Sequence, residues 1–252
     1  MKGRSRSSSI ATRRSKKHTK KRERWTCARV QRELKTLADP GVRAKMAYFG
    51  VHVPKAHGVS APVLHALAKK IGKDPLLAGQ LWKTGIHEAR ILATLIGESD
   101  KVTSEQMERW ARDFDSWDVV DAACCYLFAH AKPAWAKARA WTRRKGKYLK
   151  RAGFSLAAYL SYKDKSASDA RFVEFLRVVE RETCDERNFV KKAVNWALRN
   201  IGKRNLALNR RAIACADRIH KSESPVARWI AADALRELRS KAVQVRLRRT
   251  RT

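Results

Sequence analysis

The sequence predicts an all-α protein in which pairs of helices stack one after another into a curved superhelix. Three observations lead to this fold class. From Trp25 onward Gly and Pro are sparse, while Ala, Leu, Arg and Lys, which favour helices, dominate. Alternating apolar and polar residues, the pattern of a half-buried strand, are absent. Similar helical segments recur along the chain.

Short stretches with Gly, Pro or Asp divide the chain into helical segments. In order they are "ADPG" (38–41), "IGKDP" (71–75), "IGESD" (96–100), "HAKP" (130–133) and "SESP" (222–225). Similar segments begin at residues 87, 117, 148, 189 and 226, which are 30, 31, 41 and 37 positions apart. This spacing is typical of one helix pair per unit, as in HEAT-like or armadillo-type solenoids. An array of four-helix bundles, the alternative, would lack the recurring motif.

The helical segments lie between two basic ends. Residues 1–24 contain eleven Lys or Arg and one Glu with almost no apolar residue to bury, so we expect a disordered basic tail that helps to hold phosphates. The tail also resembles a transit or nuclear-import signal, although it lacks the apolar face of a transit peptide. We expect a single repeat domain over residues 25–245 and a basic C-terminal tail over residues 246–252.

Nucleic acid is the partner that the charge of the chain favours. There are 57 Lys plus Arg against 24 Asp plus Glu, a formal charge of +33. Such a charge repels itself unless a polyanion lies nearby, and we expect it to gather on the concave face of the superhelix. An acidic protein or an anionic membrane surface is a weaker alternative, and no stretch is apolar for long enough to span a bilayer.

Cysteine, histidine and glycine usage indicates no metal or cofactor. The five cysteines are odd in number and lack CxxC spacing, so we expect no disulfide framework or zinc site, which fits a reducing cytoplasm. The seven histidines form no set with metal-ligand spacing. No GxxxxGK[ST] or GxGxxG loop occurs, so no nucleotide cofactor is expected. We expect a monomer.

The segment that begins at residue 117, "WDVVDAACCYLF", carries the first candidate site residues. Trp117 and Asp121 are four residues apart and lie about 40° from each other, on one edge of the helix near the surface. They lie to one side of the apolar stripe that predicts the core face, which is made of Val120, Ala123, Cys124, Leu127 and Ala131. The pair is either an ordinary helix start, capped by Ser116 or Asp115 with a packed Trp, or a functional pair.

Two further segments favour the functional interpretation. In the segment from 189, Trp196 sits beside Lys192 and Arg199, away from the stripe Val190, Val194, Ala197, Leu198 and Ile201. In the segment from 148, Arg151 points nearly opposite the stripe, towards solvent, with Lys150 on the same side. Successive repeats thus offer two off-core tryptophans, one carboxylate and one arginine on one helix layer.

Glu88 and Arg90 are expected to be a helix-start acid and a surface base.

These motifs give the chain a resemblance to the AlkD-type DNA alkylation-repair glycosylases, bacterial HEAT-like repeat proteins that remove N3- and N7-alkylated purines. The resemblance runs from "YFGVHVP" (48) to "ADALREL" (238), and its most specific parts are "HEARILA", "SWDVVD", "KRAGF" and "NFVKKAVNWALRNIGKRN". It implies that Trp117, Asp121, Arg151 and Trp196 are the catalytic residues, with Arg151 engaging a phosphate near the lesion. The family's arginine motif begins with Lys150 here, and Tyr148 stands where relatives often have Trp.

The resemblance implies a duplex DNA partner that contains alkylated purines of the N3-methyladenine and N7-methylguanine class. Such a purine is already cationic, so the leaving group needs no protonation, and a carboxylate with aromatic faces stabilises the developing oxocarbenium ion. The family holds the lesion without a deep base-flipping pocket. A nucleoid-associated bacterial cytoplasmic location is expected. The residues expected to bind DNA are Lys150, Lys191, Lys192, Arg199, Lys203 and Arg204.

Two other functions use the same fold. A non-catalytic scaffold that recognises damaged or structured DNA or RNA needs the positive charge but not Asp121. A protein-binding HEAT adaptor would use apolar ridges, and this function leaves the charge of +33 unexplained.

Overall fold

The structure is a computed structural model that describes residues 24–249. The tail expected over residues 1–24 therefore lies, except for Arg24, outside the described residues, as do residues 250–252. Within the described part every regular element is a helix or a helical turn, which confirms the all-α fold class. The last helix continues to Arg249, so the described part of the expected C-terminal tail is helical.

The elements follow one another along the chain with short connections. They are α1 (Cys27–Thr36), α2 (Pro40–Tyr48), α3 (Ala61–Ile71), α4 (Pro75–Lys83), α5 (His87–Ile96), the 3₁₀ turn η1 (Ser99–Lys101), α6 (Ser104–Arg112), α7 (Trp117–Ala122), the π-helical turn η2 (Ala123–Leu127), the 3₁₀ turn η3 (Phe128–His130), α8 (Ala134–Trp141), α9 (Lys147–Lys163), α10 (Asp169–Arg181), α11 (Asn188–Gly202), α12 (Leu206–His220), α13 (Pro225–Leu238) and α14 (Lys241–Arg249).

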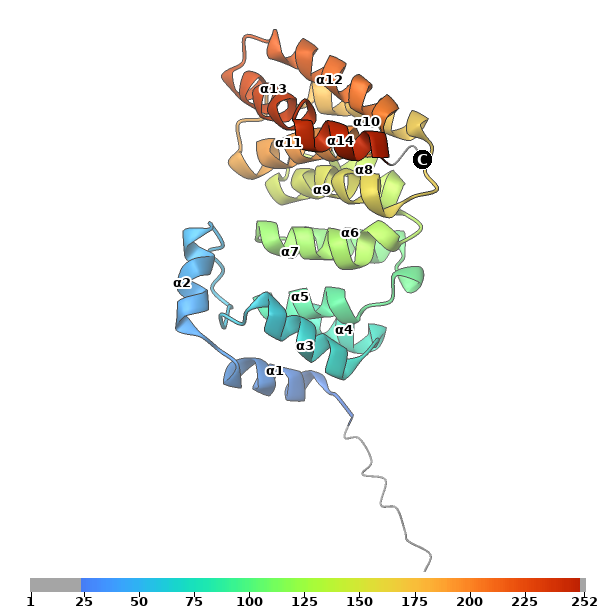
Figure 1. The fold of residues 1–252 in the computed structure, drawn as a ribbon. Helices are drawn as coiled ribbons and strands as arrows, with labels where there is room; N and C mark the ends of the chain where they lie inside the picture. Colours follow the sequence, from blue (N-terminus) through green and yellow to red (C-terminus); the bar gives the residue numbers. More distant parts are fainter. Residues whose placement is uncertain (1–23, 250–252) are drawn as a thin grey trace, which may run out of the picture.

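The helices stack in two layers that follow the chain from α3 to α13 (Figure 1). One layer contains α5, α7, α9, α11 and α13, each of which contacts the next. Helices α4, α8, α10 and α12 of the other layer pack on the helix that follows them. The first layer begins its helices at residues 87, 117, 147, 188 and 225, within one residue of the predicted repeat starts. The repeat prediction is therefore confirmed.

The predicted breaks coincide with helix boundaries because they contain caps and prolines. Asp39, Asp74 and Ser224 cap α2, α4 and α13 by accepting hydrogen bonds from backbone N–H groups of the first turn. A proline follows each cap at the first helical position, where its missing N–H costs no hydrogen bond.

The predicted apolar stripes of α7 with η2 and of α11 are buried in the core, but α9 differs from its prediction. Helix α9 packs against α7, α8 and α11, so it is buried on nearly all sides from Arg151 to Ala158. The prediction that Arg151 points towards solvent is wrong, because only 6% of this residue is exposed. An arginine in such a place needs partners for its charge.

Helix α2 stands beside the stack and has no buried residue (Figure 1). The loop that follows it returns to α3 and is held by Glu88, whose carboxylate accepts hydrogen bonds from the backbone N–H groups of His57 (2.9 Å), Gly58 (2.6 Å) and Val59 (3.3 Å). Glu88 lies in the first turn of α5, as predicted for a helix-start acid, but it is fully buried and not solvated. Its role is to fix this loop.

Candidate active site

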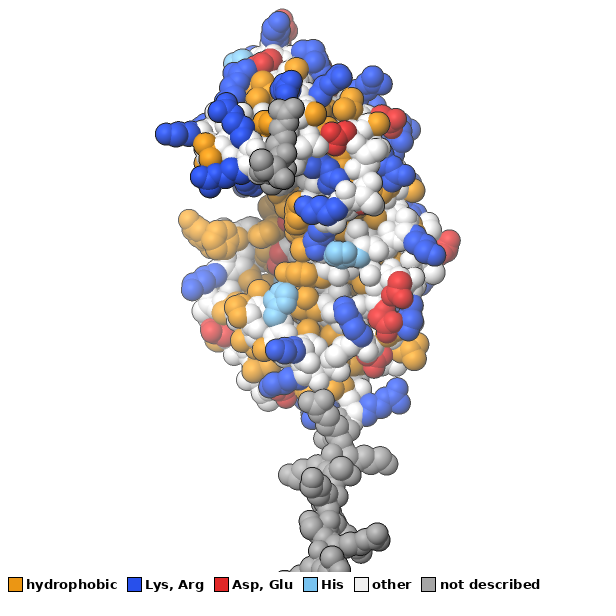
Figure 2. All heavy atoms as spheres, turned by 45° about the vertical axis from the view of Figure 1, so that its right-hand side comes forward, with side chains coloured by type: hydrophobic (Ala, Val, Ile, Leu, Met, Phe, Trp, Pro, Cys, Tyr) orange, Lys and Arg blue, Asp and Glu red, His pale blue; other side chains and the backbone are white. Residues whose placement is uncertain are grey.

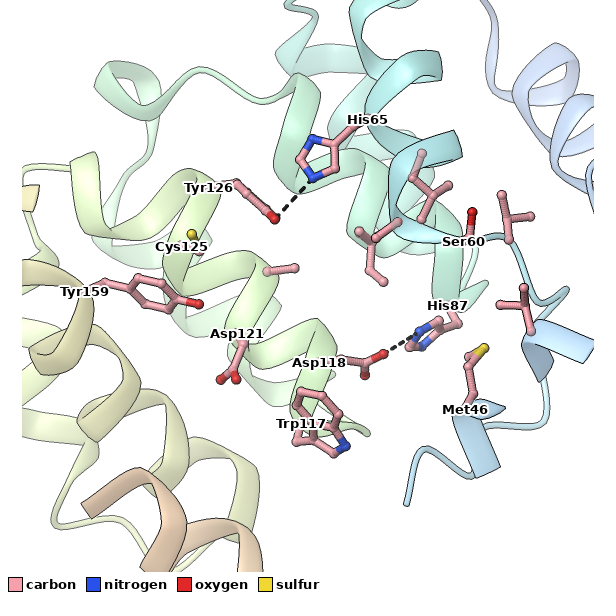
Figure 3. A pocket seen from close by; sticks show the side chains of 16 residues that line it. Met46, Ser60, His65, His87, Trp117, Asp118, Asp121, Cys125, Tyr126 and Tyr159 are labelled. Carbon is pink, nitrogen blue, oxygen red and sulfur yellow. Dashed lines mark hydrogen bonds and ion pairs between the residues drawn. The ribbon is translucent and has the colours of Figure 1, made fainter. Parts of the chain in front are cut away.

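A cavity of about 280 Å³ opens between α2, α3, α5, α7, η2 and α9. Figure 2 shows a hollow between the two halves of the molecule, with hydrophobic side chains and histidines along its edge. Figure 3 shows Trp117, Asp121 and Tyr159 on one side of the cavity and His87 on the other. This volume is near the lower end of the ~300–1,000 Å³ typical of small-molecule sites, so the cavity accommodates a group about as large as a base.

Trp117 and Asp121 reach the cavity wall because they lie one turn apart at the start of α7. The indole Nε1 of Trp117 donates a hydrogen bond to the backbone oxygen of Phe49, 3.0 Å away. This bond connects the start of α7 to the end of α2. Val119 and Val120 of α7 are fully buried in the core, and Ala122 joins Trp117 and Asp121 at the cavity.

Asp121 is held in a buried network by α9. Its Oδ2 accepts from Nη2 of Arg151 at 2.6 Å, and its Oδ1 accepts from Nε of Arg151 at 3.1 Å and from the hydroxyl of Ser155 at 2.9 Å. The third Arg151 nitrogen, Nη1, donates to the backbone oxygen of Phe189 at 2.8 Å. The bidentate pair fixes the carboxylate plane, and the second lone pair of Oδ2 has no partner among the described residues.

Burial raises the pKa of both acidic groups at this wall of the cavity, Asp121 and Tyr159. Burial raises the pKa of the Asp121 carboxyl, while the guanidinium of Arg151 and the hydroxyl of Ser155 act against the rise. Burial and the neighbouring carboxylate also raise the pKa of Tyr159, which therefore stays a neutral phenol at pH 7. The expectation that Asp121 lies near the surface is wrong, since its side chain is only 17% exposed.

Trp196 lies behind this wall and does not line the cavity. It packs edge-to-face on Tyr159 with ring centroids 4.9 Å apart, and Tyr159 is the aromatic group that faces the cavity. The guanidinium carbon of Arg151 lies 5.7 Å from the centre of the Trp117 ring. The structure thus brings Trp117, Asp121 and Arg151 together. The ring of Tyr159 separates Trp196, the fourth predicted catalytic residue, from the cavity.

Most of the cations expected to bind DNA are tied to other helices. Lys150 forms ion pairs with Glu182 (2.7 Å) and Asp185 (3.0 Å). Arg199 and Lys203 both pair with Glu237. These contacts hold α9 against the loop before α11, and α11 against α13. The prediction that these three side chains bind DNA stays a prediction, and each of them already has an acidic partner in the unbound protein.

Three of the expected DNA-binding residues remain to be placed. Arg204 donates to the backbone oxygens of Ser161 (2.8 Å) and Ala167 (3.0 Å), so it too fixes a connection between helices. Lys191 lies with its Nζ 5.1 Å from the centre of the exposed Trp229 ring, and Lys192 is exposed without a salt bridge in the described chain. Neither lysine forms a salt bridge in the described part of the chain, and DNA binding by both stays a prediction.

The sequence reasoning missed a buried ion pair on the far side of the cavity. Nε2 of His87 lies 3.0 Å from Oδ2 of Asp118, as the dashed line in Figure 3 shows. Burial alone would lower the pKa of His87, but the hydrogen bond that its Nε2–H donates to Asp118 and the charges of Asp118, Glu88 and Asp115 raise it overall. Both residues lie in segments that the sequence had singled out, but their pairing joins two repeats 31 positions apart in the chain.

The described residues contain no group of three or more His, Cys, Asp or Glu side chains that could hold a metal ion. All five cysteines are free thiols. No helix within the described residues is both long and apolar enough to cross a membrane.

The fold and the site define a HEAT-like solenoid with a buried aspartate–arginine pair beside an aromatic-lined cavity. The chain matches the family described as "DNA alkylation repair enzyme" over residues 30–238 and belongs to that family. The resemblance seen in the sequence motifs is therefore confirmed for the family. No curated protein sequence matches the chain.

A solved structure supports the fold. It is described as "a new family of proteins related to the HEAT-like repeat DNA glycosylases with affinity for branched DNA structures". Its TM-score with this chain is 0.72 at 21% sequence identity, and the match covers 85% of this chain and 96% of that one.

Proposed function

We propose that the protein is a DNA glycosylase that hydrolyses the N-glycosidic bond of positively charged alkylated purines, the N3-methyladenine and N7-methylguanine class, in duplex DNA. The observation that supports this function best is the carboxylate of Asp121, fixed in a cavity wall between Trp117 and Tyr159. An oriented carboxylate beside aromatic faces is what a reaction that creates a cationic sugar requires.

The chemistry follows from the charge of the substrate. When the bond between C1′ and the purine nitrogen breaks, its electron pair neutralises the purine, and the positive charge moves to the sugar. The free lone pair of Asp121 Oδ2 accepts a hydrogen bond from water, whose oxygen then forms the new bond to C1′ and whose proton leaves to the carboxylate or to solvent. No group needs to protonate the departing base.

Arg151 acts in this proposal as a positioning residue in the unbound protein. Three of the five N–H donors of its guanidinium point at Asp121 and at the Phe189 carbonyl, so the carboxylate has one orientation before DNA arrives. A phosphate near the lesion would have to reach the remaining donors or draw the side chain away from Asp121. The contact between Arg151 and a phosphate stays a prediction.

The decisive experiment measures release of 7-methylguanine from methylated duplex DNA by the wild type and by Asp121→Asn. We expect Asp121→Asn to lower the single-turnover rate about 10²-fold or more, because one positioned electrostatic group typically contributes that much. The matched control is Ser155→Ala, which removes one hydrogen bond from the same carboxylate and keeps its charge. Its rate should fall much less.

Stability must be measured with the rate. Removing one partner of a buried ion pair costs about 3–5 kcal/mol, so Asp121→Asn should melt at a lower temperature than the wild type. Rates are therefore compared at a temperature at which circular dichroism shows both proteins folded. A wild type that releases no base, or an Asp121→Asn variant as fast as the wild type, would contradict the proposal.

A second candidate function is a non-catalytic protein that binds branched DNA. The observation that favours it is the buried pair itself, since Arg151 neutralises most of the charge that Asp121 would offer to a cationic sugar. The solved relative described above, which has affinity for branched DNA, shares the fold. Tight binding of a DNA junction with no release of base from any alkylated substrate would favour this function.

A further inference from the structure

The end of α2 displays two aromatic side chains that no packing accounts for. Tyr48 is 85% exposed and Phe49 is 63% exposed, and their rings meet edge-to-face with centroids 5.1 Å apart. They are the last residue of α2 and the residue that caps it, and we call them the aromatic tip. Two large adjacent rings in water cost free energy, so their position indicates contact with a partner.

The backbone of the aromatic tip is fixed although its rings are free. The oxygen of Phe49 accepts the hydrogen bond from Trp117 Nε1. The next residue, Gly50, has a φ of +78°, and a Cβ there would lie 3.1 Å from the ring of Phe189. Only glycine therefore fits between the tip and α11. The tip is held directly beside the candidate active site.

Cations and aromatic rings alternate along the surface next to the tip. Phe189 stacks with Tyr148 at a centroid distance of 6.2 Å, and Nζ of Lys147 lies 4.3 Å from the centre of the Tyr148 ring. Lys191 lies over the ring of Trp229 in the same way, 5.1 Å from its centre. Alternating rings and cations are typical of surfaces that bind unpaired nucleotides, with the rings under the bases and the cations near the phosphates.

We propose that the aromatic tip, Tyr48 and Phe49, is a wedge that stacks on unpaired bases of DNA beside the candidate active site. A protein partner fits less well, because two rings among cations offer far less apolar area than the ~1,000 Å² of a specific protein interface. The inference rests on the DNA binding of the proposed function and not on base release.

The test compares two fluorescently labelled duplexes of one sequence, one fully paired and one with a central bulge of unpaired adenines. Wild-type protein should bind the bulged duplex about 10-fold or more tightly than the paired one, because stacking of a base on an aromatic side chain has that effect. The double variant Tyr48→Ala with Phe49→Ala should lose this preference and keep its affinity for the paired duplex.

Three controls make the result specific. Leu76→Ala removes another exposed hydrophobic side chain, 75% exposed on α4, and should leave the preference intact. The double variant Tyr48→Trp with Phe49→Trp retains the stacking surface and should restore it. A 2-aminopurine in the bulge should lose fluorescence on binding wild type but not on binding the double alanine variant.

The outcomes separate this inference from the proposed function. A wild type that binds neither duplex would refute DNA binding and with it both proposals. A wild type that binds both duplexes equally, or a double alanine variant that keeps the full preference, would overturn the wedge alone. If the wild type were a dimer and the double alanine variant a monomer, the tip would instead be a contact with a second copy of the chain.

Discussion

At the scale of single residues, the pairing of Asp121 with Arg151 joins α7 to α9 and at the same time prepares the candidate active site. The two side chains lie 30 positions apart, one repeat, so the stack itself brings them together. A fully exposed carboxylate would be mobile and strongly hydrated, whereas this one is oriented before DNA binds. The arrangement has a cost, because the arginine that orients the charge also neutralises it.

The identities of the site residues could be predicted from the sequence, but their surroundings could not. The off-stripe positions of Trp117 and Asp121 placed them correctly beside each other. Periodicity describes one helix alone, however, and it could not show that the outer face of α9 is covered by α7 and α11. For the same reason Arg151 was expected in solvent, and the ion pair of His87 with Asp118 was not expected at all.

The ion pair of His87 and Asp118 should make stability depend on pH. The folded-state pKa of His87 is raised and that of Asp118 is lowered. The histidine's contribution is therefore present below its unfolded pKa of 6.5 and is lost as pH rises through the folded value. The aspartate's contribution is present above 3.8 and is lost as pH falls through its folded value.

We therefore expect His87→Gln to lower the free energy of unfolding more at about pH 5.5 than at about pH 9, as measured by urea denaturation. His220→Gln, at an exposed histidine that forms no ion pair in the described chain, serves as the control and should have a small effect at both pH values. A loss for His87→Gln that is equal at the two pH values would show that the imidazole is neutral in the folded protein.

At the scale of elements, close approach between helices explains a glycine that helix propensity disfavours. Gly153 lies inside α9, and a Cβ there would lie 2.6 Å from the backbone nitrogen of Thr142 at the end of α8. Gly79 lies inside α4, and a Cβ there would meet nothing within 4 Å. The same substitution should thus have opposite effects at the two sites.

Gly153→Ala should lower the free energy of unfolding by about 1–3 kcal/mol, because the new methyl group collides with backbone that cannot move away. Gly79→Ala should raise it by up to about 1 kcal/mol through helix propensity alone. Urea denaturation of both variants provides the measurement. A stabilised Gly153→Ala variant would mean that α8 and α9 separate more easily than their packing indicates.

The helices themselves could be predicted more fully than the surfaces between them. Breaks and repeat starts depend on local caps and prolines, so they are visible in the sequence. The position of α2 beside the stack depends on Gly50, on Glu88 and on the hydrogen bond from Trp117, which join segments far apart in the chain. No local pattern contains this information.

At the scale of the whole molecule, the formal charge of +33 overstates the charge that DNA can use. Lys150, Arg199 and Lys203 belong to ion pairs that hold the repeats together. Lys192, exposed and without a salt bridge within the described residues, is available to a phosphate. The paired cations should therefore affect stability, and the unpaired ones should affect the dependence of DNA binding on salt.

Lys192→Gln should reduce the slope of log affinity against log salt by up to about one, since one phosphate contact releases roughly 0.9 counterions. Lys203→Gln should leave this slope unchanged and lower the melting temperature, because Glu237 loses a partner. Binding titrations at several salt concentrations, together with thermal melts, distinguish the two effects. Equal slopes for both variants would mean that Lys192 does not approach DNA.

The π-helical turn η2 has a consequence for how the active site tolerates changes in chain length. A π turn contains one residue more than an α turn, and here it directly follows the helix that carries Trp117 and Asp121. Deleting one residue between 123 and 127 would let the chain continue as an ordinary α-helix with its hydrogen bonds intact. Because the π turn already contains that extra residue, its loss would keep the preceding turns in register with Phe128 and the core beyond it, whereas one residue lost between Trp117 and Asp121 would turn these two side chains by about 100° relative to each other. A single codon lost in the π turn would thus leave the carboxylate at the cavity, whereas one lost between the two site residues would separate folding from function.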